Sequence, residues 1–231
     1  MRGALVEFMP TFLIPLPNVI VFQFNPETMS HAWTQPEAAG GKAAANPLAV
    51  KGMPGETFSF TIALDANDQI ADGSAVTAGL AKVSGIYSRI AALEMLMYPT
   101  GAAGGGLLGS VSASIGAGGV SLGGSASGVT RTVPASTVPT VLFVWGVGRI
   151  VPVRVTGLTI TEKLYDSLLN PTHAEANLTL RVLTPEELQA TDDILSGVAK
   201  VAYTYTFALR QALAVANLAN AAESIIGMLP I

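Results

Sequence analysis

The chain has 231 residues, of which 50% are hydrophobic and 12% are charged, and its net charge is −4 at pH 7. An average soluble domain is about 25% charged, so much of this surface is expected to be covered by partner proteins. The twelve basic residues form no stripe, which argues against nucleic acid as a partner. No uninterrupted apolar run reaches the roughly 18 residues of a membrane span, and the absence of cysteine excludes disulfides and thiolate metal sites. An acid at Glu7 interrupts the apolar stretch that a secretory signal needs, so a cytoplasmic location is expected.

The N-terminal part of the chain predicts two strands separated by a proline-rich link. Short β-branched and aromatic runs occupy residues 5–9 and 18–24, and the second run stops at Asn25 and Pro26. The Ala-, Gly- and Pro-rich residues 35–55 show neither helical nor strand periodicity, and they predict a loop or arm.

Residues 56–65 carry the clearest strand pattern in the chain. Apolar and hydroxyl side chains alternate, which places the apolar set on one sheet face and the hydroxyl set on the other. The two sets are Phe58, Phe60, Ile62 and Leu64 on one face, and Thr57, Ser59 and Thr61 on the other.

A helix is predicted over residues 84–98, ending at Pro99. Its apolar residues Ile86, Ile90, Leu93 and Met97 recur at steps of four, three and four, which is one side of an α-helix.

Residues 100–139 form an insertion dominated by Gly, Ser, Ala and Val, with almost no charge. Such a composition is not that of a packed core, and it predicts either a mobile segment or a hairpin lying on a neighbouring subunit. Strands are then expected over residues 140–146, 151–162 and 174–183, with an irregularity at Gly157.

The C-terminal part predicts a helical extension over residues 184–231. Thr184, Pro185 and Glu187 have the spacing of a capped helix start, and this helix is expected to run toward Leu195 and break near Gly197. The following helix has a seam of mostly small residues that is expected to dock on its own subunit or on another. The seam consists of Val201, Tyr205, Ala208, Ala212, Val215, Ala219 and Ala222.

Few residues offer catalytic or metal-binding chemistry. The only histidines, His31 and His173, lie far apart in sequence, which predicts structural roles. Acids at 186–187 and 192–193 are expected to be solvated charges near a helix start. Trp145 lies in the most apolar strand, which favours burial. We therefore expect no enzymatic activity, no cofactor and no metal.

Five segments of the chain carry a recognisable series of motifs. In chain order they are Phe22-Gln23-Phe24-Asn25-Pro26, the strand with Phe58 and Phe60, Leu93-Glu94-Met95-Leu96 before Tyr98-Pro99, Phe143-Val144-Trp145-Gly146, and the run from Leu158 through Glu162 to Tyr165. Together they resemble the tube proteins of contractile injection systems, which are phage-tail-like particles. The LysM-like module with which members often end is not recognisable here.

The resemblance implies a sheet-rich α+β fold like that of phage tail tubes, an antiparallel β-sandwich or barrel with a packed helix, over residues 1–183. It also implies a homo-hexameric ring that acts as tube initiator or baseplate adaptor. The partners would be the inner tube protein, the spike or hub protein and other baseplate proteins. Assembly would take place in the cytoplasm, with release of the particle from the cell left open.

Two alternatives from other functional classes stay open on the sequence. One is a hydrolase of cell-wall polymers, for which Glu162, Asp192 and Asp193 are the candidate acids. The other is a membrane-active component of the same particle, suggested by the Ala- and Leu-rich tail and the Gly- and Ala-rich insertion.

Overall fold

The fold was analysed in a computed structural model that describes residues 1–9, 16–36, 48–71, 84–99, 138–189 and 196–228. The described elements, in chain order, are β1 (Ala4–Met9), β2 (Leu16–Val21), β3 (Met29–Thr34), β4 (Gly55–Asp65), α1 (Ala66–Ala71), α3 (Tyr87–Met95), β5 (Val141–Val144), β6 (Ile150–Tyr165), β7 (Pro171–Val182), α4 (Pro185–Gln189) and α5 (Ser196–Met228).

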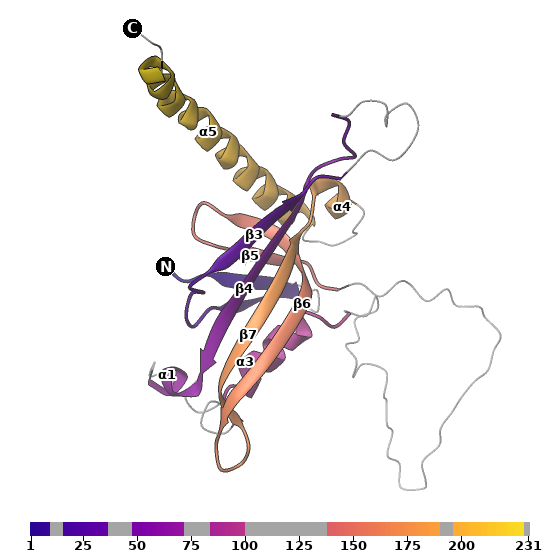
Figure 1. Ribbon diagram of the computed structural model, residues 1–231. Coiled ribbons are helices and arrows are strands. Elements are labelled where there is room, and N and C mark those ends of the chain that lie inside the picture. Colours follow the sequence, from indigo (N-terminus) through magenta and orange to yellow (C-terminus); the bar gives the residue numbers. More distant parts are fainter. Residues whose placement is uncertain (10–15, 37–47, 72–83, 100–137, 190–195, 229–231) are drawn as a thin grey trace, which may run out of the picture.

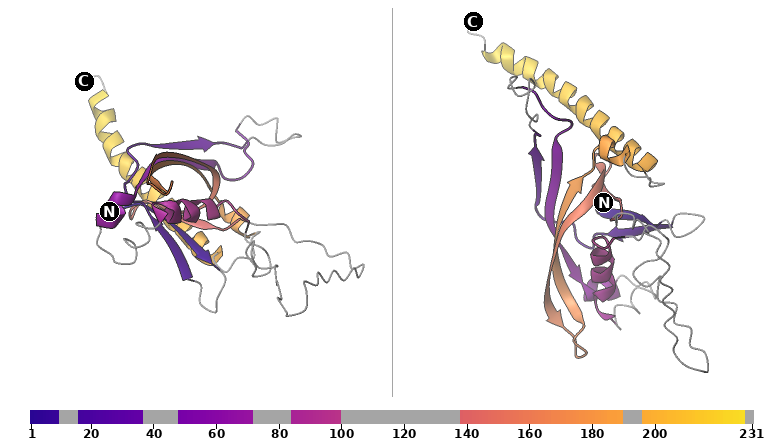
Figure 2. Two further views of the ribbon diagram at one scale, coloured as in Figure 1. Left: turned by 90° about the horizontal axis from the view of Figure 1, so that it is seen from below. Right: turned by 90° about the vertical axis from the view of Figure 1, so that its right-hand side faces the viewer.

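The described strands form one antiparallel 7-stranded sheet in the order β2-β1-β5-β6-β7-β4-β3. The sheet is strongly curved, and α3 lies against its inner face (Figure 2). The α+β class is confirmed. The sheet is open, because β2 and β3 at its two ends do not pair with each other, whereas the resemblance implied a sandwich or a barrel.

The alternation predicted for β4 is confirmed. Phe58, Phe60, Ile62 and Leu64 are buried against the helix side, while the hydroxyl residues between them face outward. Burial of such a side chain contributes about 1.5–3 kcal/mol, so this strand alone largely determines which face of the sheet becomes the core.

The central helix is shorter than predicted. Ile86, Ile90 and Leu93 are buried as expected, but Met97 is more than one-third exposed, and Leu96 is buried in its place. The regular helix ends at Met95, before the expected stop at Pro99, because the chain tightens into turns in which Leu96 and Met97 donate N–H groups to carbonyls three residues back.

The longest strands, β6 and β7, form a hairpin that extends well below the rest of the sheet (Figure 1). The irregularity predicted at Gly157 is confirmed, since the register between β6 and β7 shifts between Val155 and Gly157. A second set of shifts near Glu162 and Leu164 was not predicted.

The predicted start of α4 is also confirmed. The Thr184 N–H donates to Glu187 Oε2 at 2.9 Å, and the Glu187 N–H donates to Thr184 Oγ1 at 3.4 Å, which together form a capping box. The expected extension of α4 toward Leu195 lies outside the described residues. The same holds for the predicted insertion over residues 100–139, except for its last two residues.

Within its own subunit, helix α5 docks through a different side from the small-residue seam, so docking of the seam on another subunit stays a prediction. Ala199, Ala202 and Thr206 are buried, whereas Val201 is 70% and Val215 is 66% exposed. At 3.6 residues per turn these two sets lie on opposite sides of the helix. The seam residues Val201, Tyr205, Ala208, Ala212 and Val215 are therefore all exposed.

Candidate assembly surfaces

Five of the residues shared with the tube-protein resemblance form the aromatic centre of the core. The rings of Phe22, Phe58, Phe60, Phe143 and Trp145 form a connected cluster with centroid distances from 5.3 to 6.5 Å. Phe143 contacts the other four rings. The four phenylalanines are buried and stabilise the fold, so they are not available to contact a partner, whereas Trp145 is only half-buried.

The turn after β2 is built by another motif residue, Asn25. Its Oδ1 accepts the Gly3 N–H at 2.9 Å, and its Nδ2 donates to the Met1 carbonyl at 3.1 Å. The chain here ties the N-terminus to the end of β2, while Phe24 beside it is 45% exposed and Pro26 is partly buried.

The remaining motif residues are divided between core and surface. Leu93 is buried and Glu94 is exposed. Gly146 has φ of 69° in the turn after β5, a conformation that glycine adopts without strain. At the far end of β6, a hydrogen bond to Glu162 raises the pKa of the exposed Tyr165 hydroxyl.

A buried ion-pair cluster, which sequence reasoning missed, joins α5 to β3 and β4. Arg210 donates to both carboxylate oxygens of Glu56, from Nη1 at 2.9 Å and from Nη2 at 2.5 Å. His31 Nε2 lies 2.7 Å from Glu56 Oε1, and only 3% of the Glu56 side chain is exposed. One signal was present in the sequence: Glu56 lies in phase with the apolar residues of β4, so its carboxylate had to be paired inside the domain.

Aromatic rings and a second cation surround this cluster. The Arg210 guanidinium lies 4.9 Å from the Trp33 ring centre, and Arg149 lies 5.1 Å from that of Phe58. Burial and the neighbouring positive charge of Arg210 lower the pKa of Arg149, while Glu56 opposes this effect. The arrangement fits a structural clamp between a helix and a sheet edge.

The edge strand β3 is the second feature that sequence reasoning missed, since residues 29–34 carry no clean alternation. It pairs with β4 along Met29–Thr34, and its other side has no strand beside it in the described sheet. Ser30, Ala32 and Thr34 are exposed, and the strand contains no lysine, proline or acid of the kind that protects free edges.

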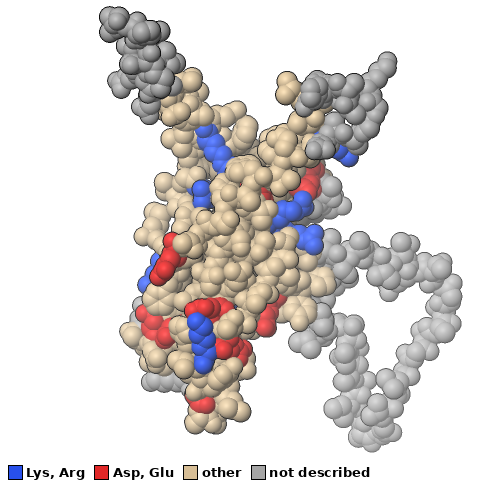
Figure 3. Space-filling view, viewed as in Figure 1, with Lys and Arg blue, Asp and Glu red and all other residues tan. Residues whose placement is uncertain are grey.

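The outer face of the long strands is polar and carries its charges toward the strand ends, with Arg154 and Arg181 at one end and Lys163 and Glu175 at the other. Figure 3 shows charged side chains around the face and few in its middle, over β4 and β7. The residues that point outward there are mainly hydroxyl and amide residues: Thr57, Ser59 and Thr61 on β4, Thr156, Thr159 and Thr161 on β6, and Asn177 and Thr179 on β7.

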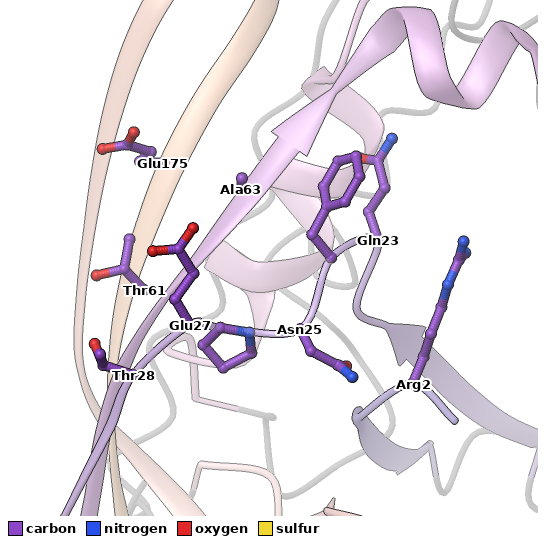
Figure 4. Close-up of a pocket in the computed structure, with 10 residues that line it drawn as sticks. Arg2, Gln23, Asn25, Glu27, Thr28, Thr61, Ala63 and Glu175 are labelled. Atoms are coloured by element: carbon purple, nitrogen blue, oxygen red, sulfur yellow. The ribbon is translucent and has the colours of Figure 1, made fainter.

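The hollow shown in Figure 4 offers little chemistry. It is lined by Arg2, Glu27, Thr61 and Glu175, together with the residues of the turn after β2. Its Gln23 is already bonded to the Asp65 backbone and the Asp68 carboxylate, and Glu175 pairs with Lys163 on the neighbouring strand.

The residues considered for catalysis do not converge in the described part of the chain. His31 pairs with Glu56 near one end of the sheet, and His173 Nδ1 lies 3.1 Å from Asp65 at the far end of the same strand, β4. The acids at 192–193 lie outside the described residues. Among the described side chains, no three of His, Cys, Asp and Glu are grouped as metal ligands.

Comparison with known proteins adds no assignment. No protein-family model matches the chain, and a search of curated proteins found no match. None of the described helices combines the length and the apolar character needed to cross a membrane.

Proposed function

We propose that the chain is a structural subunit of a contractile injection particle, a tube initiator or baseplate adaptor that forms a hexameric ring between the spike hub and the inner tube. The observation that carries the proposal is the unprotected edge of an open antiparallel sheet at β3. A free strand edge binds another extended strand through its backbone N–H and C=O groups, and a closed ring satisfies the edges of every copy.

The outer face of β4, β6 and β7 supports the same proposal. A sheet face of hydroxyl and amide side chains is hydrated without attracting one sign of charge, which suits the wall of a wide bore. On this proposal the sheets of neighbouring copies join edge to edge around the ring. The face of β4, β6 and β7 that is outermost in the single chain then lines the bore, and α3 lies on the outside of the ring. The resemblance to tube proteins likewise implies strands that pair across subunits into a six-fold ring.

The experiment is a native mass measurement of the purified full chain, alone and co-expressed with the tube and spike proteins of its particle. We expect a species of six times the 23.7-kDa chain mass and a six-fold ring by electron microscopy. A double variant, Ser30→Lys with Ala32→Lys, places two like charges on the β3 edge and is expected to abolish the ring.

The matched control is Thr159→Lys with Thr161→Lys, which adds the same charge to exposed positions on β6, a strand that is already paired on both sides. This control is expected to keep the ring. A chain that stays monomeric with its partners present, or an edge variant that assembles as well as its control, would show that the proposal is wrong.

A further inference from the structure

Helix α5 is anchored along only part of its length. Its 33 residues span about 50 Å, and the anchored part ends near Arg210. Every residue from Gln211 to Leu218 is exposed. Figure 1 shows the C-terminal part of α5 projecting from the domain. We call the segment Gln211–Leu218 the arm.

The direction of the arm is set by polar contacts at its base. Thr206 Oγ1 accepts the Ile150 N–H at 3.0 Å and donates to the Ile150 carbonyl at 2.7 Å. The Tyr205 hydroxyl donates to the Val147 carbonyl at 2.9 Å, and Arg210 binds the buried Glu56 through two hydrogen bonds. The arm therefore leaves the domain in a defined direction.

That direction leads past the open edge of the sheet. Arg210 bonds to Glu56 on β4 and lies over Trp33 on β3, the last strand. The helix then continues beyond the ends of these two strands (Figure 2). The arm thus starts beside β3 and continues past the end of that strand.

The composition of the arm indicates a protein contact. No charged residue occurs between Arg210 and Glu223. Leu213, Val215 and Leu218 are all more than 60% exposed. Val215 and Leu218, three residues apart, share one side of the helix. Neighbouring exposed apolar side chains of this kind mark interaction sites on soluble proteins.

We infer that the arm packs on a second copy of this chain, the copy that adds its strand to β3. The inference rests on the proposed ring. A specific interface covers about 800 Å² on each partner, and a six-residue strand edge is a small part of that area. The arm supplies additional surface at the place where a neighbour at β3 must lie.

The first test is the dissociation constant of the full-length assembly, measured by light scattering or native mass over a dilution series. The double variant Val215→Glu with Leu218→Glu is expected to raise the constant by at least ten-fold, because both charges would be buried in the contact. The matched control, Leu164→Glu with Leu168→Glu, places the same charges on exposed apolar residues at the tip of the β6–β7 hairpin and is expected to change it little.

The second test uses the absence of cysteine from the chain. A benzophenone attached to Val215→Cys should give covalent dimers on illumination. In these dimers the arm of one copy should be joined to a peptide of the second copy that lies at the β3 edge. Cross-links confined to the chain's own domain, or flotation of the protein with liposomes through the arm, would overturn the inference.

The two proposals fail in different ways. A wild-type chain that never assembles overturns both the ring and the arm contact. An assembly that is lost in the β3 edge variant but keeps its dissociation constant in the arm variant overturns the arm contact alone.

Discussion

Arg210 and Glu56 are 154 residues apart in the chain and form a two-hydrogen-bond ion pair, with the carboxylate almost completely buried. This pair fastens α5 to the strand next to the open edge of the sheet. The position of the C-terminal helix therefore depends on the buried carboxylate of Glu56, which requires a cation beside it.

Replacing Arg210 by Ala is expected to destabilise the fold by about 3 kcal/mol, because the change removes two hydrogen bonds from the buried Glu56 carboxylate. Urea unfolding followed by circular dichroism measures the effect. Arg154→Ala is the control, since Arg154 is exposed on β6 and its loss should cost within about 0.5 kcal/mol. Equal midpoints for the two variants would contradict the role given to the pair.

Phe143 and Phe24 both belong to the motif segments but should respond differently to truncation. Phe143→Ala removes the ring that touches Phe22, Phe58, Phe60 and Trp145, and it should cost about 3–5 kcal/mol. Phe24→Ala removes a side chain that is nearly half exposed and should cost less than about 1 kcal/mol. Thermal unfolding of both variants measures the contrast, and similar melting temperatures would place Phe143 outside the core.

Gly85 should not tolerate a side chain, whereas Gly197 should. Gly85 has φ of 56°, and a Cβ there would lie 2.2 Å from the Pro171 carbonyl oxygen, so Gly85→Ala should cost about 2 kcal/mol or more. Gly197 is near the start of α5 with nothing within 4 Å of such a Cβ, so Gly197→Ala should be neutral or stabilising by up to about 1 kcal/mol. Chemical denaturation distinguishes them, and a neutral Gly85→Ala would contradict the close approach of these backbones.

The stability of the fold should decline in acid through Glu187. Burial tends to raise its pKa, but hydrogen bonds from the Thr184 backbone and Arg181 outweigh burial, so the pKa lies below the ordinary value of 4.5. The stabilisation is fully present above that value and is lost as the pH falls through the lowered pKa.

Glu187→Gln should flatten the fall in unfolding free energy below pH 4.5. Denaturant titrations between pH 3 and pH 7 measure this slope for the variant and for the unaltered chain. A slope at Glu187→Gln identical to that of the unaltered chain would rule out this source of acid sensitivity.

The elements that could be predicted from the sequence are those with local signals. The alternation in β4, the break at Gly157 in β6 and the cap at Thr184 each depend on residues within one turn or one strand. Local periodicity and capping chemistry decide such features before any tertiary contact forms, which is why they could be predicted.

Contacts between distant parts of the chain determine which surfaces stay open and which side of α5 packs on the sheet. β3 becomes a strand through its pairing with β4 and not through a pattern of its own. Small residues occur around much of α5, so helical periodicity could not separate the buried Ala202 and Thr206 from the exposed seam at Val201. That choice follows from the pairing of Arg210 with Glu56, a contact between distant parts of the chain that no local pattern encodes.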